Sequence, residues 1–104
     1  TVGASKSMQV GANLSENIGS NRSVDVGSHQ TTSVGKDDSL KVGKNLVIDA
    51  GDSIVIKTGK ATISMKKDGT ISIQGKDITI NGSGEINVKA SKDITMKGKK
   101  ILQN

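Results

Sequence analysis

Apolar and polar residues alternate along this chain in a pattern that repeats about every eight residues. Two apolar residues stand two positions apart in most repeats, and a single polar residue usually separates them. Clear examples are Met8/Val10, Val24/Val26, Leu40/Val42 and Ile54/Ile56. A spacing of two places both side chains on one face of a β-strand. No segment has the i, i+3, i+4 spacing of an amphipathic helix. The pattern therefore predicts short strands, about one per repeat.

Glycine marks the end of each strand in the first half of the chain. A clean copy of the repeat is Val42-Gly43-Lys44-Asn45-Leu46-Val47-Ile48-Asp49. The glycines that recur in this register, and that we expect to form the corners, are Gly3, Gly11, Gly19, Gly27, Gly35, Gly43, Gly51 and Gly59. Glycine tolerates a positive φ or a sharp corner that a β-carbon would obstruct. Each octad is thus expected to be a strand followed by a corner.

The apolar pairs continue after Gly59, although the glycine register changes. They are Ile63/Met65, Ile71/Ile73, Ile78/Ile80, Ile86/Val88 and Ile94/Met96. We therefore expect one domain over residues 1–104, with regular [VI]-G octads in 1–59, Ile-x-Ile repeats with shifted corners in 60–98 and a distal tail in 99–104. The connections do not resemble Asn-Gly hairpins. We expect the chain to turn the same way at every corner, as a coil and not a meander.

The composition favours an assembly of several chains over a self-contained one. Only 32% of the 104 residues are hydrophobic, and aromatic residues and proline are absent. Two architectures fit: one chain winds alone as a three-sided solenoid, or three chains wind around one another. Three chains pool their apolar residues around a narrow axis and pair every strand edge. The prediction is an all-β, intertwined triple-stranded β-helix, a triangular prism formed by a homotrimer. Disorder is the alternative, but the apolar residues are periodic.

The predicted core residues of this prism are the inward members of the best-formed repeats. They are Val42, Leu46, Ile48, Ile54, Ile56, Ile71, Ile73, Ile78, Ile80, Ile86, Val88 and Ile94.

The net charge of +5 arises entirely in the last part of the chain. Residues 60–104 carry nine lysines against four acidic residues. These lysines would either attract an anionic membrane surface or, as we favour, keep exposed strands soluble and discourage sideways pairing. Nucleic-acid binding is not expected, because there are no aromatic residues for base stacking and no recognition helix.

Catalysis has little support in the sequence, so we expect no enzyme, no resident metal and no cofactor. Cysteine is absent and His29 is the only histidine; strand parity places it outward, as a solvated side chain.

Glu16 is predicted to point inward, so three copies would converge on the trimer axis. Lys6 and Arg22 lie on either side of it, and together the three residues form a candidate internal ion cluster, with ions or waters trapped on the axis. Solvent access near a loose end is the alternative.

Several repeats resemble a known family. The Val-Gly octads, followed by Gly69-Thr70-Ile71-Ser72-Ile73, Lys76-Asp77-Ile78-Thr79-Ile80 and Ser91-Lys92-Asp93-Ile94-Thr95-Met96-Lys97, resemble the C-terminal needle of VgrG proteins, the spikes of the bacterial type VI secretion system. The chain is also similar to the needles of contractile-tail phage baseplate spikes. The resemblance covers essentially all 104 residues, and the octads alone do not separate the two families.

The resemblance implies a membrane-puncturing homotrimeric shaft on a larger base. It also implies a PAAR-type tip protein or effector at the distal end, for which Lys99, Lys100, Ile101 and Leu102 are candidate contacts. Such a needle leaves the bacterial cytoplasm through a contractile injection system, to the outside or into a target cell. The chain begins with Thr1, so we expect a fragment or a processed product. A phage puncturing needle and a β-solenoid adhesin or glycan-binding module are the alternative functions.

Overall fold

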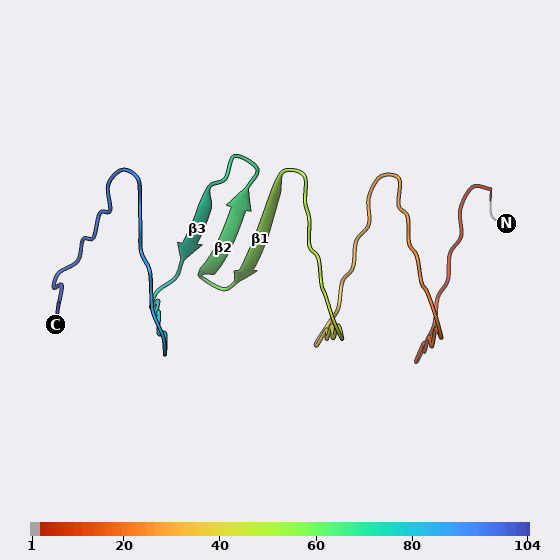
Figure 1. Cartoon of the computed structure of the whole chain (residues 1–104). Coiled ribbons are helices and arrows are strands. Elements are labelled where there is room, and N and C mark those ends of the chain that lie inside the picture. The colour runs from red at the N-terminus through yellow and green to blue at the C-terminus, as the bar shows by residue number, and fades with distance from the viewer. Residues whose placement is uncertain (1–2) are drawn as a thin grey trace. The chain divides into compact units, whose positions relative to one another are not determined.

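A computed structural model describes residues 3–104 of the chain. Val2, which precedes the first repeat glycine, lies outside the described residues. The described part contains three β-strands and no helix: β1 (Ser53–Thr58), β2 (Ala61–Lys66) and β3 (Ile71–Gln74) (Figure 1). The all-β class predicted from the sequence is therefore confirmed. Between residues 3 and 104, no helix is long and apolar enough to cross a membrane.

The structure divides the chain into two units, Thr1–Gly43 and Lys44–Asn104. In the described part of the first unit, irregular segments of backbone are separated by bends that begin at the repeat glycines. The second unit contains the three strands and further bends on both sides of them. This division falls near Gly43, whereas the change in repeat form that the sequence shows falls after Gly59.

The eight-residue period continues after Gly59, although the residues at the corners change. A turn begins at Gly59 and another at Lys67, and bends then begin at Lys76, Ser83, Ser91 and Lys99. From Gly59 to Lys99 the chain advances 40 residues, or five octads, in steps of 8, 9, 7, 8 and 8. One longer step and one shorter step cancel, so the corners return to their original spacing.

The three strands form an antiparallel sheet in the order β1-β2-β3. The prediction that the chain turns the same way at each corner is wrong for this segment, which is a meander. Gly59-Lys60 forms the two-residue connection between β1 and β2. Gly59 has φ +54°, and no non-glycine residue in the described chain has a positive φ. Positive φ at the first central residue alone is the pattern of a type II′ hairpin turn.

The second reversal is a three-residue loop, Lys67-Asp68-Gly69, between β2 and β3. The Gly69 N–H donates to the Lys66 carbonyl at 3.0 Å, and the Lys66 N–H donates to the Thr70 carbonyl at 3.0 Å. Gly69 has φ +96°, as expected for the left-handed residue that closes such a loop. The Lys67 N–H also donates to the Asp52 carbonyl at 2.9 Å, which ties the loop to the start of β1.

The register gives the sheet one apolar face and one mostly polar face. Across the strands, Ile54 pairs with Met65, Ile56 with Ile63, Ile63 with Ile73, and Met65 with Ile71. Neighbours paired in this way share a face. We call these six residues, Ile54, Ile56, Ile63, Met65, Ile71 and Ile73, the apolar face. The residues between them, including Val55, Ser64 and Ser72, lie on the opposite face. The predicted alternation is confirmed in this segment.

One chain by itself contains no core. Among residues 3–104 none is buried, and only Ile54, Thr62, Ser64 and Gly75 are half-buried. Even Ile80, a predicted core residue, is 77% exposed. The predicted core belongs to a trimer, which a single chain does not test, so those residue assignments stay predictions.

The repeat glycines before Gly59 are not required by the geometry of the single chain. From Gly3 to Gly51, none of the seven has a positive φ, and a Cβ added at any of them would meet no atom within 4 Å. Gly82 is different, because a Cβ there would lie 2.9 Å from Cγ1 of Ile86. The recurrence of glycine in the octads therefore has no steric cause within one chain.

We expect Gly69→Ala to lower the free energy of unfolding by about 1–2 kcal/mol, the usual cost of a left-handed backbone for an L-residue. Gly84→Ala is the matched control, because Gly84 has neither a positive φ nor an atom within 4 Å of the added Cβ. Urea unfolding followed by circular dichroism, at one chain concentration, measures both. Equal effects of the two substitutions would contradict the assigned loop.

Candidate functional site

The apolar face is a functional candidate. It lies on the only regular sheet of the described residues, and nothing within residues 3–104 buries it. Ile56 is 59% exposed, and the other members of the face are exposed or half-buried. A sheet needs a second layer to bury its apolar face, and each large aliphatic side chain gains about 1.5–3 kcal/mol on full burial. The geometry therefore leaves an apolar surface that lacks a second layer.

Charge is confined to the opposite face of this sheet. Lys57, Thr62 and Gln74 lie side by side there across β1, β2 and β3, and Ser53 pairs with Lys66 at the far end. The apolar face carries no charged residue. Two or more copies of it can meet without bringing like charges together, whereas the lysine-bearing face opposes such contact.

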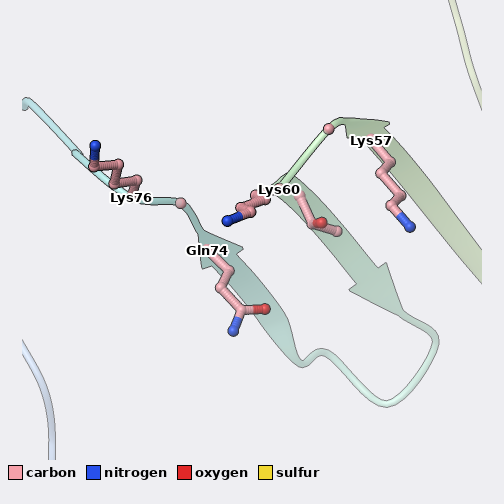
Figure 2. A pocket seen from close by; sticks show the side chains of 7 residues that line it. Lys57, Lys60, Gln74 and Lys76 are labelled. Carbon is pink, nitrogen blue, oxygen red and sulfur yellow. The ribbon is translucent and has the colours of Figure 1, made fainter.

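An open hollow of about 500 Å³ lies at one end of the sheet. It is lined by the polar row Lys57, Thr62 and Gln74, by the Gly59-Lys60 turn and by Gly75-Lys76. Figure 2 shows Lys57 at the end of β1, Lys60 at the start of β2, Gln74 on β3 and Lys76 on the segment that follows. We call this feature the lysine hollow. No carboxylate lines it.

A smaller hollow of about 150 Å³ lies at the other end of the sheet and has mixed charge. Asp49, Asp52, Lys66 and Lys67 contribute to its lining. Lys67 Nζ lies 3.4 Å from Asp52 Oδ1, and both side chains are largely exposed. An exposed pair of this kind contributes little to stability. The two ends of one sheet therefore differ in charge balance.

The structure brings together two of the three residues of the candidate ion cluster. Arg22 Nε lies 3.9 Å from Glu16 Oε1, with both side chains exposed in the single chain. Lys6 forms no ion pair within residues 3–104. A trimer axis is not present in one chain, so the convergence of three Glu16 carboxylates stays a prediction.

The remaining predicted positions show no catalytic arrangement. The Ser28 Oγ and His29 Nδ1 atoms are 2.6 Å apart and share a hydrogen bond on the exposed surface. In the described part of the chain, no three His, Cys, Asp or Glu residues are placed to hold a metal ion. At the distal end, Ile101 and Leu102 are exposed, Leu102 by 85%; their role in tip contact stays a prediction.

The sequence pattern did not predict the lysine hollow. Lys57 and Lys60 flank the Gly59 turn, so a Gly-Lys pair between two alternating runs was a usable signal for that half of it. Gln74 and Lys76 are distant in sequence and join the hollow only through the register of β2 with β3.

Comparison with known proteins does not extend this picture. A scan against models of protein families finds no match, and a search of curated proteins finds none.

Asp68 provides a pH-dependent contribution to the β2–β3 loop. Its Oδ1 accepts a hydrogen bond from the Thr70 N–H at 3.0 Å. Hydrogen bonds from the Thr70 backbone and side chain hold the pKa of Asp68 below its ordinary value, because they favour the ionised form. A depressed folded pKa stabilises the fold above the unfolded pKa, and this contribution is lost as pH falls through the folded pKa.

We therefore expect stability to decline at acidic pH partly through Asp68. Asp68→Asn retains an oxygen acceptor but does not titrate, so its loss of stability between neutral and acidic pH should be smaller than that of the wild type. Thermal unfolding across this pH range measures the difference. The control is Asp77→Asn, which removes a carboxylate outside this loop. Identical pH slopes for wild type and Asp68→Asn would refute the assignment.

Proposed function

We propose that this chain is the shaft of a homotrimeric β-helical needle, a mechanical part of a type VI secretion spike of the VgrG kind. One observation carries the proposal: apolar pairs recur every octad, yet the single chain buries none of them between residues 3 and 104. A soluble chain with this pattern must bury it against other chains. Identical chains are the simplest partners, since all carry the same eight-residue spacing.

The sheet suggests how three copies would pack. If each copy contributes its β1–β2–β3 sheet as one wall, three walls close a triangular prism with the apolar faces inward. Lys57 and Lys66 then lie on the outside, in water. In this version of the trimer, the walls at residues 53–74 are formed within each chain, and the intertwined pairing is confined to the octads on either side.

Backbone pairing supports the same arrangement. Outside residues 53–74, the described chain forms no strand ladder of its own. Extended backbone with unpaired N–H and C=O groups is stable when neighbouring chains supply the partners. A closed prism pairs these groups on all sides, so bending would break several hydrogen bonds together. Stiffness of this kind is what a puncturing needle requires.

The repeat glycines from Gly3 to Gly51 also fit an assembly. Each of these seven lies at a bend with empty space around it in the single chain. A neighbouring chain that approaches the corner closely would explain why a side chain is excluded there in every octad.

The other parts of the proposal follow from the resemblance to VgrG needles. In this proposal Ile101 and Leu102, which are exposed in the single chain, contact a PAAR-type tip protein or effector, and the target-cell membrane is a transient partner. The needle would leave the bacterial cytoplasm through the contractile apparatus. A phage baseplate needle uses the same architecture and is the second candidate, since the octad pattern favours both.

We expect a solution mass of about 32 kDa, three times the 10.7 kDa chain. Light scattering at several concentrations measures it. A constant mass near that of one chain would end the trimer proposal.

We expect Ile56→Asp to abolish the trimer, because it places a charge in the proposed core. Val55→Asp is a matched control: in the single chain Val55 is 60% exposed and Ile56 59%, but they lie on opposite faces of β1. A monomeric chain predicts small, similar effects for both. Only the trimer predicts loss of assembly at Ile56 with assembly kept at Val55. Wild-type mass for Ile56→Asp would refute the inward assignment.

A further inference from the structure

The lysine hollow differs in charge balance from the hollow at the other end of the same sheet. Three lysines, Lys57, Lys60 and Lys76, contribute to the lining of one open space of about 500 Å³. The lining contains no acidic residue. At the other end of the same sheet, the two lysines of the smaller hollow are accompanied by Asp49 and Asp52. Carboxylates therefore accompany the lysines at one end of the sheet and not at the other.

Neutral donors accompany these lysines. Thr62 on β2 and Gln74 on β3 belong to the polar row and also line the hollow. A threonine hydroxyl and a glutamine amide both donate hydrogen bonds. Adjacent strands lie about 4.8 Å apart, so the donors on β2 and β3 fall within the span of one small polyatomic ligand. An anion with several oxygen atoms matches this set.

The local fold holds the hollow in place. Lys57 and Lys60 flank a two-residue turn whose backbone requires a positive φ at Gly59. Gly75, which is half-buried, leads from β3 to Lys76. The backbone positions are therefore set by the sheet register, while the flexible lysine stems adjust their ammonium groups to the ligand.

We propose that the lysine hollow binds a phosphoryl oxyanion. The ammonium groups neutralise its charge as point cations, while Thr62 and Gln74 donate to its remaining oxygens. The volume is large enough for a group bigger than a single phosphate, such as a diphosphate or a phosphorylated headgroup. The site lies within one chain, so the proposal does not depend on the trimer. In the trimer, it would recur on each outer wall of the shaft.

The test is an NMR titration of the ¹⁵N-labelled full chain with inorganic pyrophosphate, at physiological salt to screen long-range attraction. We expect saturable shifts confined to the amides of Gly59, Lys60, Gly75 and Lys76. The double variant K57Q/K60Q should bind at least about tenfold more weakly, since it removes two of the three cations. The double variant K66Q/K67Q has the same net charge and should stay within about twofold of the wild type.

Three results would overturn the proposal: no saturable binding, shifts spread over all lysine-rich segments, or equal weakening in both double variants. Light scattering and circular dichroism show whether the variants assemble as the wild type does. If K57Q/K60Q does not, K57R/K60R keeps the charge and should keep the binding. The amide map of the wild type decides the question without any variant.

A second arm identifies the source of the phosphoryl group. Phosphatidylcholine vesicles containing phosphatidate are sedimented with the chain, with and without pyrophosphate. Retention that pyrophosphate abolishes, and that K57Q/K60Q lacks, supports a lipid-borne phosphate. Binding of pyrophosphate without vesicle retention supports a free phosphate compound. Vesicle retention that K57Q/K60Q and K66Q/K67Q weaken equally reflects general charge and counts against the site.

Discussion

Within residues 3–104 nothing buries the apolar surface of this chain, and the rest of the structure depends on that constraint. A β-layer hides its apolar side only by packing against another layer, and residues 3–104 supply one three-stranded sheet and no second layer. Aliphatic side chains recur at each octad but remain in contact with solvent. Burial of these side chains would therefore require contacts between chains. For this reason the proposed function is a mechanical one, performed by an assembly.

The sheet at residues 53–74 has one apolar face and one face that carries its charged residues. Ile56 and Ile63, with their neighbours, make one face uniformly apolar, while Lys57 and Gln74 lie on the other. A surface that packs on copies of itself must be neutral, and a surface that remains in water benefits from charge. The lysine hollow belongs to the second face, so a ligand there and neighbouring chains on the first face would not compete for the same residues.

The hairpins show where reasoning from the repeat went wrong. A regular period suggested identical corners, yet Gly59-Lys60 and Lys67-Asp68-Gly69 reverse the chain. The sequence does place a glycine at the residue of each hairpin that has a positive φ. Glycine also stands, however, at bends that do not reverse the chain. At Gly43, for example, φ is not positive and the surrounding space is empty. Glycine alone therefore does not distinguish the two kinds of corner.

The sequence by itself determined the all-β class, the eight-residue step and the alternation that puts Ile54 and Ile56 on one face and Val55 on the other. These features are local, because the side-chain direction along a strand depends only on position in that strand. Only the tertiary structure decided the direction of the chain after Thr58 and Lys66, and with it the grouping of Lys57, Gln74 and Lys76. Chain direction depends on one or two backbone dihedrals and on cross-strand hydrogen bonds, and a repeat period does not encode either of them.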